Sequence, residues 1–438
     1  MKNLKIFTLA AMMVIGVFTL GFSQTNNIPA PAQSQGVALV GGTLHLGDGS
    51  VVEEGTVVFN QGKITAVGSR GEVSIPEGYQ IHEIDGQEVY PGFFLPGSNM
   101  GLVEVSAVRA TDDGEETGVF NPNIRSIVAY NTDSELPPTM RYNGILMAQI
   151  APSGGVVAGS SSIVQLDAWN WEDAAYKVDN GMHLYWPNKM MSARWWMGET
   201  QARPNENYQP IVDEIQKTMK EGKAFAEGEK KATNLKLEAL AGLFDGSITL
   251  FIHTNNATAI IESATIAKEL GVQKIVIVGA EEALLVADFL KSNSIPVVLG
   301  DVHALPNRDH EDTVHPYKLP ALLHKAGVEF CFGFSGRMTA RARNLPFYAG
   351  TAVAYGLPYE EGVKALTATS AKILGVDETC GTIAVGKDAT LFVSQGDALD
   401  MRTNQMEYVF IQGRSVQLEA TQQELYKKYS NKYGHQID

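Results

Sequence analysis

Two kinds of hydrophobic pattern alternate along this chain of 438 residues. Residues 37–89 and 381–416 carry short apolar runs separated by glycine-containing turns, such as VALVGGTLHLGDG in the first segment and TIAVGKDATLFVSQGD in the second. Short apolar runs between turn signals are typical of antiparallel strands. Because each segment is too short to bury a stable core alone, we expect their strands to pack together.

Between these segments, residues 91–375 alternate apolar strand-like pieces with amphipathic helical pieces. The clearest stretch reads SITLFIHT, ATAIIESATIAKELG, KIVIVG, EEALLVADFLKSNS and IPVVLG. This alternation predicts parallel strands joined by crossover helices, and the length suits a closed barrel of about 250 residues. The predicted fold class is therefore α/β: a (β/α)8 TIM-like barrel plus a small composite β-sandwich domain made of residues 37–90 and 376–420.

The N-terminal segment predicts export. In residues 1–24, two lysines precede an apolar run and small residues follow it, as in a secretory signal peptide. Residues 25–36 are predicted to be a flexible leader, and residues 421–438 a C-terminal helix and tail. We expect a periplasmic or extracellular protein without membrane insertion after cleavage, in which Cys331 and Cys380 stay free thiols.

The negative net charge of the chain argues against some classes of binding partner. The chain has 34 Lys and Arg against 49 Asp and Glu, a formal net charge of -15. A surface of this sign repels a phosphate backbone. We therefore expect a small-molecule ligand and no nucleic acid.

Three motifs at the junctions between the β-rich segments and the barrel resemble the amidohydrolase superfamily, specifically its imidazolonepropionase-like branch. They are the opening GGTLHLGDGSVVEEGTVVFNQGKITAVG, the exit IDGQEVYPGFF, and the closing GTIAVGKDATLFV with GRSV. The resemblance implies one or two divalent metals at the carboxyl end of the barrel. In that superfamily they are held by a His-x-His pair after strand one, histidines after strands five and six, and an aspartate after strand eight. The implied activity is hydrolysis of a non-peptide carbon–nitrogen bond in a small cyclic amide or a peptide-like substrate.

Most of the implied ligands are replaced in this sequence. Gly97 and Asn99 stand at the His-x-His positions, Gly279 at the sixth-strand histidine and Ser335 at the aspartate. Only His253, after the fifth strand, is retained. A catalytic zinc site needs about three imidazole, thiolate or carboxylate ligands. His303 is a further metal candidate, but two imidazoles fall short, so no cofactor is expected and zinc remains the alternative.

Other polar residues are predicted at the same end of the barrel. A polar cup suited to an anionic small molecule is expected from Ser98, Asn99, His253, Asn255, Ser335 and Arg337. The glycines of SGG at 153–155 and GSSS at 159–162 either form an anion-binding nest or are plain tight turns. With so few ligands, we expect His253→Ala to leave folding stability nearly unchanged.

All five tryptophans lie within one stretch, from Trp169 to Trp196, which predicts a tryptophan-rich insertion in the barrel near residues 165–205. Methionines accompany them. Such a cluster favours a subunit contact or a substrate platform, and a helical subdomain with its own small core is the alternative.

Two functional hypotheses follow. The first is an exported metal-dependent hydrolase with a degenerate metal site. The second is a catalytically silent homologue that binds a ligand or pairs with an active amidohydrolase. A homo-oligomer, or a complex with such a homologue, is the expected assembly.

Overall fold

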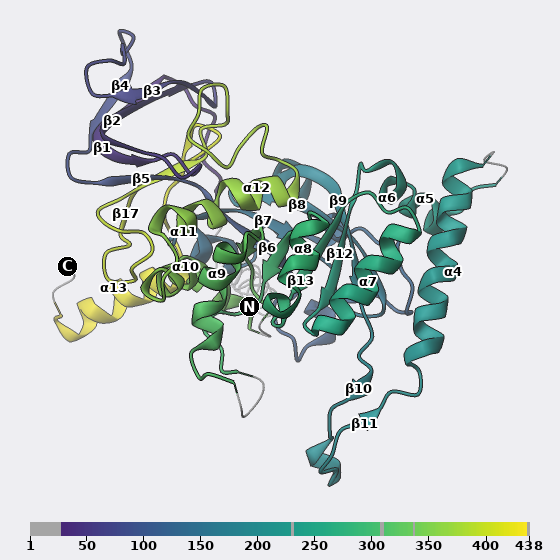
Figure 1. Cartoon of the computed structure of the whole chain (residues 1–438). Coiled ribbons are helices and arrows are strands. Elements are labelled where there is room, and N and C mark those ends of the chain that lie inside the picture. The colour runs from purple at the N-terminus through teal and green to yellow at the C-terminus, as the bar shows by residue number, and fades with distance from the viewer. Residues whose placement is uncertain (1–27, 229–231, 307–310, 336–337, 436–438) are drawn as a thin grey trace, which may run out of the picture. The chain divides into compact units, whose positions relative to one another are not determined.

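The computed structural model describes residues 28–228, 232–306, 311–335 and 338–435. The predicted signal peptide and the first residues of the leader, as well as Arg337, lie outside the described residues. The chain divides into two units, one made of residues 29–418 and the other containing residues 419–438. Figure 1 shows the whole chain.

The first sheet is built from both β-rich segments, as the apolar pattern predicted. Its strand order is β18-β17-β16-β5-β1-β2-β3, and β4 pairs with β1. The strands are β1 (Val37–His45), β2 (Val51–Asn60), β3 (Lys63–Ser69), β4 (Gln80–Glu83), β5 (Glu88–Pro91), β16 (Leu391–Ser394), β17 (Met406–Ile411) and β18 (Arg414–Ser415). The two segments join where β5 pairs with β16 in antiparallel register.

This sheet curves around its own core. Phe59 of β2 and Phe410 of β17 lie several strands apart in the sheet, yet their ring centroids are 4.9 Å apart. Leu39, Val89 and Leu391 share that core and are buried. The two layers of the composite domain are therefore one continuous sheet.

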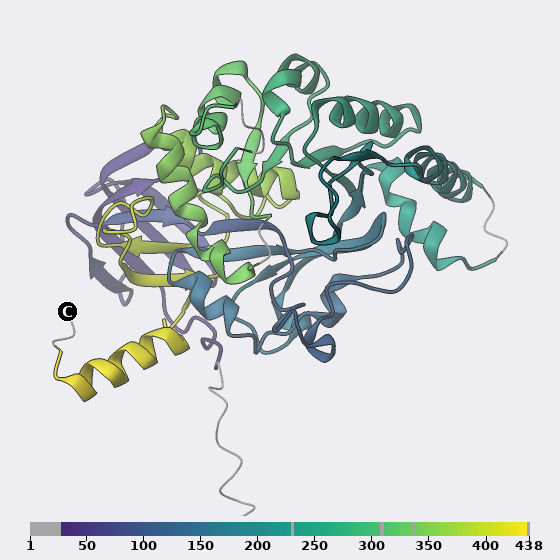
Figure 2. The same ribbon diagram turned by 90° about the horizontal axis from the view of Figure 1, so that it is seen from below.

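The second sheet forms a nearly closed TIM-like barrel. Its strand order is β15-β14-β13-β12-β9-β8-β7-β6. The strands are β6 (Phe93–Ser98), β7 (Ile145–Ile150), β8 (Val157–Gln165), β9 (Ala175–Tyr185), β12 (Thr249–Thr254), β13 (Ile275–Gly279), β14 (Val297–Leu299) and β15 (Phe330–Phe332). Figure 2 looks toward the end of the barrel from which β10 and β11 project.

One strand departs from the all-parallel prediction. β8 is antiparallel to both of its neighbours, β7 and β9. Because β7 and β8 are joined by a hairpin rather than a crossover helix, residues 151–156 lie at the carboxyl end of the barrel beside the ends of the parallel strands. The glycine turn at 153–155 is this hairpin.

Helices cover the outside of the barrel. Their apolar faces pack on outward-facing strand residues such as Leu250 and Ile252. They are α2 (Leu136–Arg141), α3 (Trp171–Ala174), α4 (Tyr208–Glu227), α5 (Leu235–Leu240), α6 (Gly242–Asp245), α7 (Ala257–Glu269), α8 (Ala287–Ser292), α9 (His315–Ala326), α10 (Leu345–Ala354) and α11 (Tyr359–Leu366). Helix α12 (Ala368–Leu374) instead packs against the inward-facing strand residues.

The barrel interior has an apolar lower layer. Phe94, Met147, Phe251 and Val298 from four strands pack there with Leu374 of α12. Cys331 and Cys380 are buried in the same cluster as free thiols, which confirms that prediction. Burial raises the pKa of the Cys331 thiol to about 12, so the thiol is protonated and unreactive at neutral pH.

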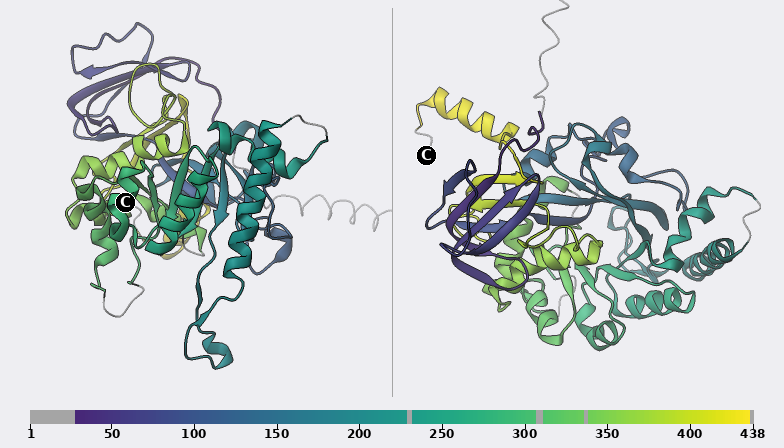
Figure 3. Two further views of the ribbon diagram at one scale, coloured as in Figure 1. Left: turned by 45° about the vertical axis from the view of Figure 1, so that its right-hand side comes forward. Right: turned by 90° about the horizontal axis from the view of Figure 1, so that it is seen from above.

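The tryptophan-rich stretch does not form one insertion. Residues 175–185 are strand β9 of the barrel, and Trp186 directly after it is buried in the main core. The chain then projects as a narrow arm of β10 (Met190–Met191), a short 3-10 turn and β11 (Arg203–Pro204), visible in Figures 1 and 3. A helical subdomain is therefore not what these described residues build.

Buried ionic contacts connect the barrel, the first sheet and the leader. Asp167, after β8, accepts hydrogen bonds from Arg141 Nη1 at 2.9 Å and from Arg414 Nη1 of β18 at 2.8 Å. Its Oδ2 also accepts from the backbone N–H of Ala30 at 2.9 Å. The leader residues next to β1 are thus held by the same carboxylate that joins the two sheets.

The second unit contains helix α13 (Thr421–Tyr433), in the region predicted to be helical. No helix in the described part of the chain has both the length and the apolar character needed to cross a membrane.

Candidate functional site at the carboxyl end of the barrel

His253 stands at the end of β12 and contacts a second histidine. Its Nε2 lies 2.8 Å from Nδ1 of His183, on the neighbouring strand β9. The His253 ring stacks on Tyr185 with centroids 4.1 Å apart, and the His183 ring stacks on Phe251 at 5.1 Å. The two imidazoles thus form one hydrogen-bonded pair enclosed by aromatic rings.

Both imidazoles are neutral at neutral pH. Burial lowers the pKa of His253 to about 3. Burial, with the nearby His253 ring, also holds the pKa of His183 well below 6.5. Nε2 of His183 is buried and has no hydrogen-bond partner among the described residues. The pair is therefore a neutral polar group inside the barrel with one unsatisfied nitrogen.

Buried polar side chains of β7, β8 and β9 form a second hydrogen-bonded group inside the barrel. Gln149 of β7 accepts a hydrogen bond from the Gly97 N–H at 3.1 Å and donates to Ser161 Oγ of β8 at 2.9 Å. Ser161 Oγ in turn donates to Asn180 Oδ1 of β9 at 3.1 Å. These polar groups satisfy each other and fix the backbone of β6 where the family carries its His-x-His pair.

The residues at and directly after the end of β6 provide no strong metal ligand. Gly97 has a φ of +64° and open space where a Cβ would lie. Ser98 is buried, and its Oγ accepts from the Met100 N–H at 3.1 Å. Asn99 Oδ1 accepts a hydrogen bond from Thr339 Oγ1 at 2.6 Å. Ser98 and Asn99 therefore stabilise the local turn and its contact with the segment after β15.

Asn255 fills the space near Gly279, the position of the sixth-strand histidine. A Cβ on Gly279 would come within 2.2 Å of Asn255 Oδ1, and Gly279 has a φ of +93°. The Asn255 amide donates to Glu281 Oε1 at 3.1 Å. A side chain at position 279 is thus excluded both by backbone conformation and by its neighbour.

Asp301, which the sequence reasoning did not single out, lies beside the eighth strand. It follows β14, and its Oδ1 accepts a hydrogen bond from the Ser335 N–H at 3.1 Å. A carboxylate from strand seven is therefore placed next to Ser335, where the family's aspartate would follow strand eight.

A cavity of about 190 Å³ lies at the ends of β13, β14 and β15. Gly279, Gly300 and Ser335 line it, together with four carboxylates and one imidazole: Glu281, Glu282, Asp301, Glu311 and His315. Of the predicted polar cup, Ser335 lines this cavity and Asn255 contacts its Glu281, whereas Ser98, Asn99 and His253 are engaged elsewhere on the barrel rim. The residues predicted to form one polar cup therefore lie in separate places on the barrel rim.

His303 does not complete a metal site with His253. Its Nε2 lies 2.7 Å from Thr351 Oγ1 of α10, and its ring packs against Tyr348 with centroids 4.7 Å apart. Burial, with the positive charge of Arg341, lowers the pKa of His303. The structure does not bring the two candidate metal ligands together, because His303 contacts α10 and His253 contacts His183.

The residues present do not fit the family's metal. Nε2 of His253 is occupied by His183, and no group of three metal-binding side chains is found among the described residues. A ring nitrogen engaged in a hydrogen bond is not available as a ligand unless that bond breaks.

The glycine-rich turns are filled by protein rather than open to an anion. The Ser153 N–H donates to the Gly114 carbonyl at 2.8 Å. A Cβ on Gly159 would lie 2.5 Å from the Ile124 carbonyl oxygen. These contacts support plain tight turns, packed under residues 114–124, and not an anion-binding nest.

His183 is the main residue that the sequence reasoning missed. It lies among the tryptophans that predict an insertion, whereas the structure places it on strand β9 of the barrel. The alternation of NGMHLYW was the available signal, since it places His183 and Tyr185 on the same face of a strand.

Comparisons with known proteins identify the fold. The amidohydrolase family model matches residues 170–416, more than half of the chain. No curated protein sequence matches. An amidohydrolase from Thermotoga maritima has 24% identity and a TM-score of 0.76, covering 87% of this chain and 99% of that chain.

More distant structures share the same architecture. Molinate hydrolase has 16% identity and a TM-score of 0.53, covering 88% of this chain and 95% of that chain. Ochratoxinase from A. niger has 15% identity and a TM-score of 0.51, covering 87% and 96%. Identities this low show the fold alone, but with the family match they lead to one conclusion: the chain belongs to the amidohydrolase family.

Proposed function

We propose that this chain is an exported amidohydrolase-family protein that binds a small molecule at the carboxyl end of its barrel without metal-dependent hydrolysis. The observation that carries the proposal is the hydrogen bond between His253 and His183. It engages Nε2 of the one retained histidine, while the other family positions hold Gly97, Asn99, Gly279 and Ser335. Without a metal, a water molecule in the site keeps its high pKa and is a poor nucleophile.

The cavity at the ends of β13 to β15 supports a small ligand. Its volume of about 190 Å³ lies below the about 300 Å³ at which drug-sized pockets begin. Its described lining is acidic, which favours an amine or another cationic group. An anionic ligand would need cations from outside the described residues, such as Arg337, because Arg341 and Arg343 do not line this cavity.

Metal analysis and ligand binding together test the proposal. The purified mature chain is expected to hold well under one zinc per molecule and to show no turnover of a cyclic amide or a dipeptide. Small primary amines are expected to raise its melting temperature, and Asp301→Asn should remove that rise. Glu72→Gln, an exposed acid outside the cavity, is the control. Stoichiometric zinc together with amidase activity would overturn the proposal.

Hydrolysis of a carbon–nitrogen bond is the second candidate function. It is favoured by Asp301, whose carboxylate lies next to Ser335 and offers a group able to accept a proton there. If this function is correct, turnover should be measurable, and Asp301→Asn should abolish it while substrate still binds.

We also propose that the arm between β9 and α4 mediates self-association or pairing with an active homologue. Met190, Trp196 and Met197 on this arm are 51%, 67% and 62% exposed. Exposed apolar side chains gathered on one projection are typical of a protein contact. Light scattering should show a dimer or larger assembly that Trp196→Ser with Met197→Ser dissociates; a monomeric wild type would contradict self-association.

A further inference from the structure

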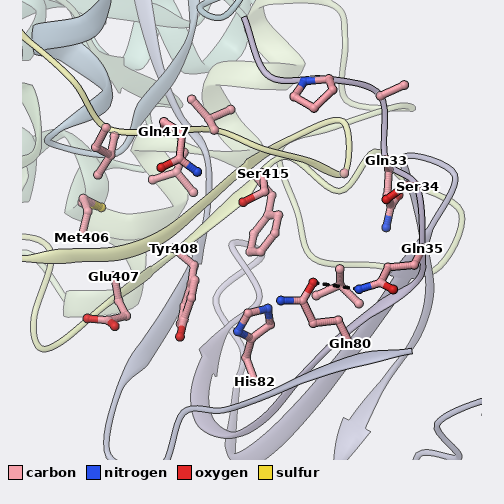
Figure 4. Close-up of a pocket in the computed structure, with 18 residues that line it drawn as sticks. Gln33, Ser34, Gln35, Gln80, His82, Met406, Glu407, Tyr408, Ser415 and Gln417 are labelled. Carbon is pink, nitrogen blue, oxygen red and sulfur yellow. Dashed lines mark hydrogen bonds between the residues drawn. The ribbon is translucent and has the colours of Figure 1, made fainter. Parts of the chain in front are cut away.

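A second cavity, of about 560 Å³, lies in the first sheet and shares no lining residue with the cavity at the barrel end. Its walls come from the leader, from β4, and from β17 and β18 with the residues after them. Figure 4 shows Gln80, His82 and Tyr408 around this space.

The lining is polar but almost uncharged. It contains four glutamines, Gln33, Gln35, Gln80 and Gln417, and two serines, Ser34 and Ser415. Glu407 is its one carboxylate, and the lining includes no lysine or arginine. Burial lowers the pKa of His82, so that ring is neutral at neutral pH. Such a cavity gives no counter-charge for a phosphate and too few carboxylates for a cation.

Two aromatic rings form one side of the cavity. His82 of β4 and Tyr408 of β17 have centroids 4.4 Å apart with their planes tilted by 55°. Both residues are partly buried, so each ring is held in place while part of its surface faces the cavity. An aromatic face carries partial negative charge and attracts the slightly positive C–H groups on one face of a saturated ring.

The amides lie beside these rings. Gln35 Nε2 donates to Gln80 Oε1 at 3.1 Å, which orients both side chains. That contact leaves both N–H groups of Gln80, and the second N–H and the carbonyl of Gln35, able to serve a ligand, because a primary amide has two donors and an acceptor. Gln33 is used differently: its Oε1 accepts from the Gly62 N–H at 2.8 Å and so fixes the leader wall.

We propose that this cavity binds a neutral saccharide, with the sugar ring on Tyr408 and His82 and vicinal hydroxyls on the amides of Gln80 and Gln35. A hydroxyl both donates and accepts hydrogen bonds, as a primary amide does, so neutral amides suit hydroxyl pairs without any charge. The apolar floor of Val37, Val409 and Phe410 lies under this polar rim, the usual composition of a small-molecule pocket. The site is independent of the function proposed for the barrel.

Titration calorimetry on the full mature chain tests this site. The probes are cellobiose, maltose and the dimer of N-acetylglucosamine, with glucose 6-phosphate as a charged comparison and trialanine as a peptide comparison. At least one neutral saccharide is expected to bind saturably, and more tightly than glucose 6-phosphate. Tyr408→Ala and Gln80→Ala should each raise its Kd at least tenfold, while Tyr408→Phe, which keeps the ring, should change it less than threefold.

Gln405→Ala is the matched control, since Gln405 is an exposed glutamine of the same sheet region that does not line the cavity. Circular dichroism and melting temperature show whether each variant is folded. The proposal is overturned if none of the saccharides binds the wild type, if binding survives both alanine variants, or if trialanine binds in their place. A variant that unfolds is replaced by Gln35→Ala, for which the same tenfold loss is expected.

Discussion

At the residue scale, the two barrel histidines depend on each other. His253 supplies a hydrogen-bond partner to the fully buried His183, whose other nitrogen is already unsatisfied. We predict that His253→Ala lowers the free energy of unfolding by about 1–3 kcal/mol, because it leaves a second buried nitrogen unpaired. From the sequence alone, almost no effect was expected, since His183 had not been recognised.

Urea unfolding at pH 7 measures this cost, with the exposed His324→Ala as control. The unfolded chain protonates His253 below a pKa of 6.5, while the folded value is about 3. The stabilisation is therefore present above pH 6.5 and is lost as the pH falls toward 3. An unfolding free energy equal to that of the wild type at pH 7 would contradict the prediction.

His45, in the first sheet, titrates in the opposite sense. Burial lowers its pKa, but the hydrogen bond to Glu360, the close contact with Glu88 and the negative charges of both carboxylates outweigh burial and raise the pKa to about 9. Its Nδ1 lies 2.8 Å from Glu360 Oε1 of α11, and its ring stacks on Tyr90. Protonated His45 thus joins the first sheet to a barrel helix.

We predict that this contact stabilises the fold by up to about 3 kcal/mol at pH 6 and contributes little above pH 9. The unfolded pKa is 6.5, so the stabilisation is complete below that pH and is lost as the pH rises through about 9. Urea titrations of wild type and His45→Gln at pH 6, 8 and 10 measure it. A difference that does not shrink with pH would rule out this role for His45.

At the scale of single elements, Gly279 at the end of β13 cannot be replaced by a residue with a side chain without strain. We predict that Gly279→Ala destabilises the protein by more than about 2 kcal/mol, since both the positive φ and the contact with Asn255 oppose a Cβ. Gly356→Ala is the matched control, because Gly356 has a φ of +106° with no atom within 4 Å. Equal losses in the two variants would show that the Asn255 contact is unimportant.

The buried carboxylate of Asp167 should matter more than any exposed ion pair. Asp167 and Arg141 are both nearly inaccessible to solvent, and Arg414 completes the group. We predict that Asp167→Asn costs about 3–5 kcal/mol, because two guanidinium groups lose their counter-charge. The exposed pair of Arg402 and Asp400 is the comparison, and Arg402→Ala should leave the unfolding free energy nearly unchanged. Similar effects in both variants would contradict this reasoning.

At the scale of the whole molecule, the pattern of apolar residues predicted both sheets. It also predicted that the two β-rich segments, far apart in the sequence, build the first sheet together. It could not predict the reversed direction of β8. A fully buried strand has the same apolar pattern whether it runs parallel or antiparallel to its neighbours, and the glycines of the β7–β8 hairpin are equally common in other loops. The site was harder to predict. His253 follows from its strand end, but its partner His183 and the carboxylate of Asp301 become neighbours only when separate strands are brought together.

The reversed strand β8 has a consequence for the order of folding. β7, β8 and β9 form a meander within residues 145–185, whereas β5 pairs with β16 between Pro91 and Leu391. Closing the longer loop costs about 2 kcal/mol more in chain entropy, so the meander should form before β5 pairs with β16. In pulse-labelled refolding, amide hydrogens of β8 and β9 should therefore be protected before those of β5 and β16, and simultaneous protection would contradict this order.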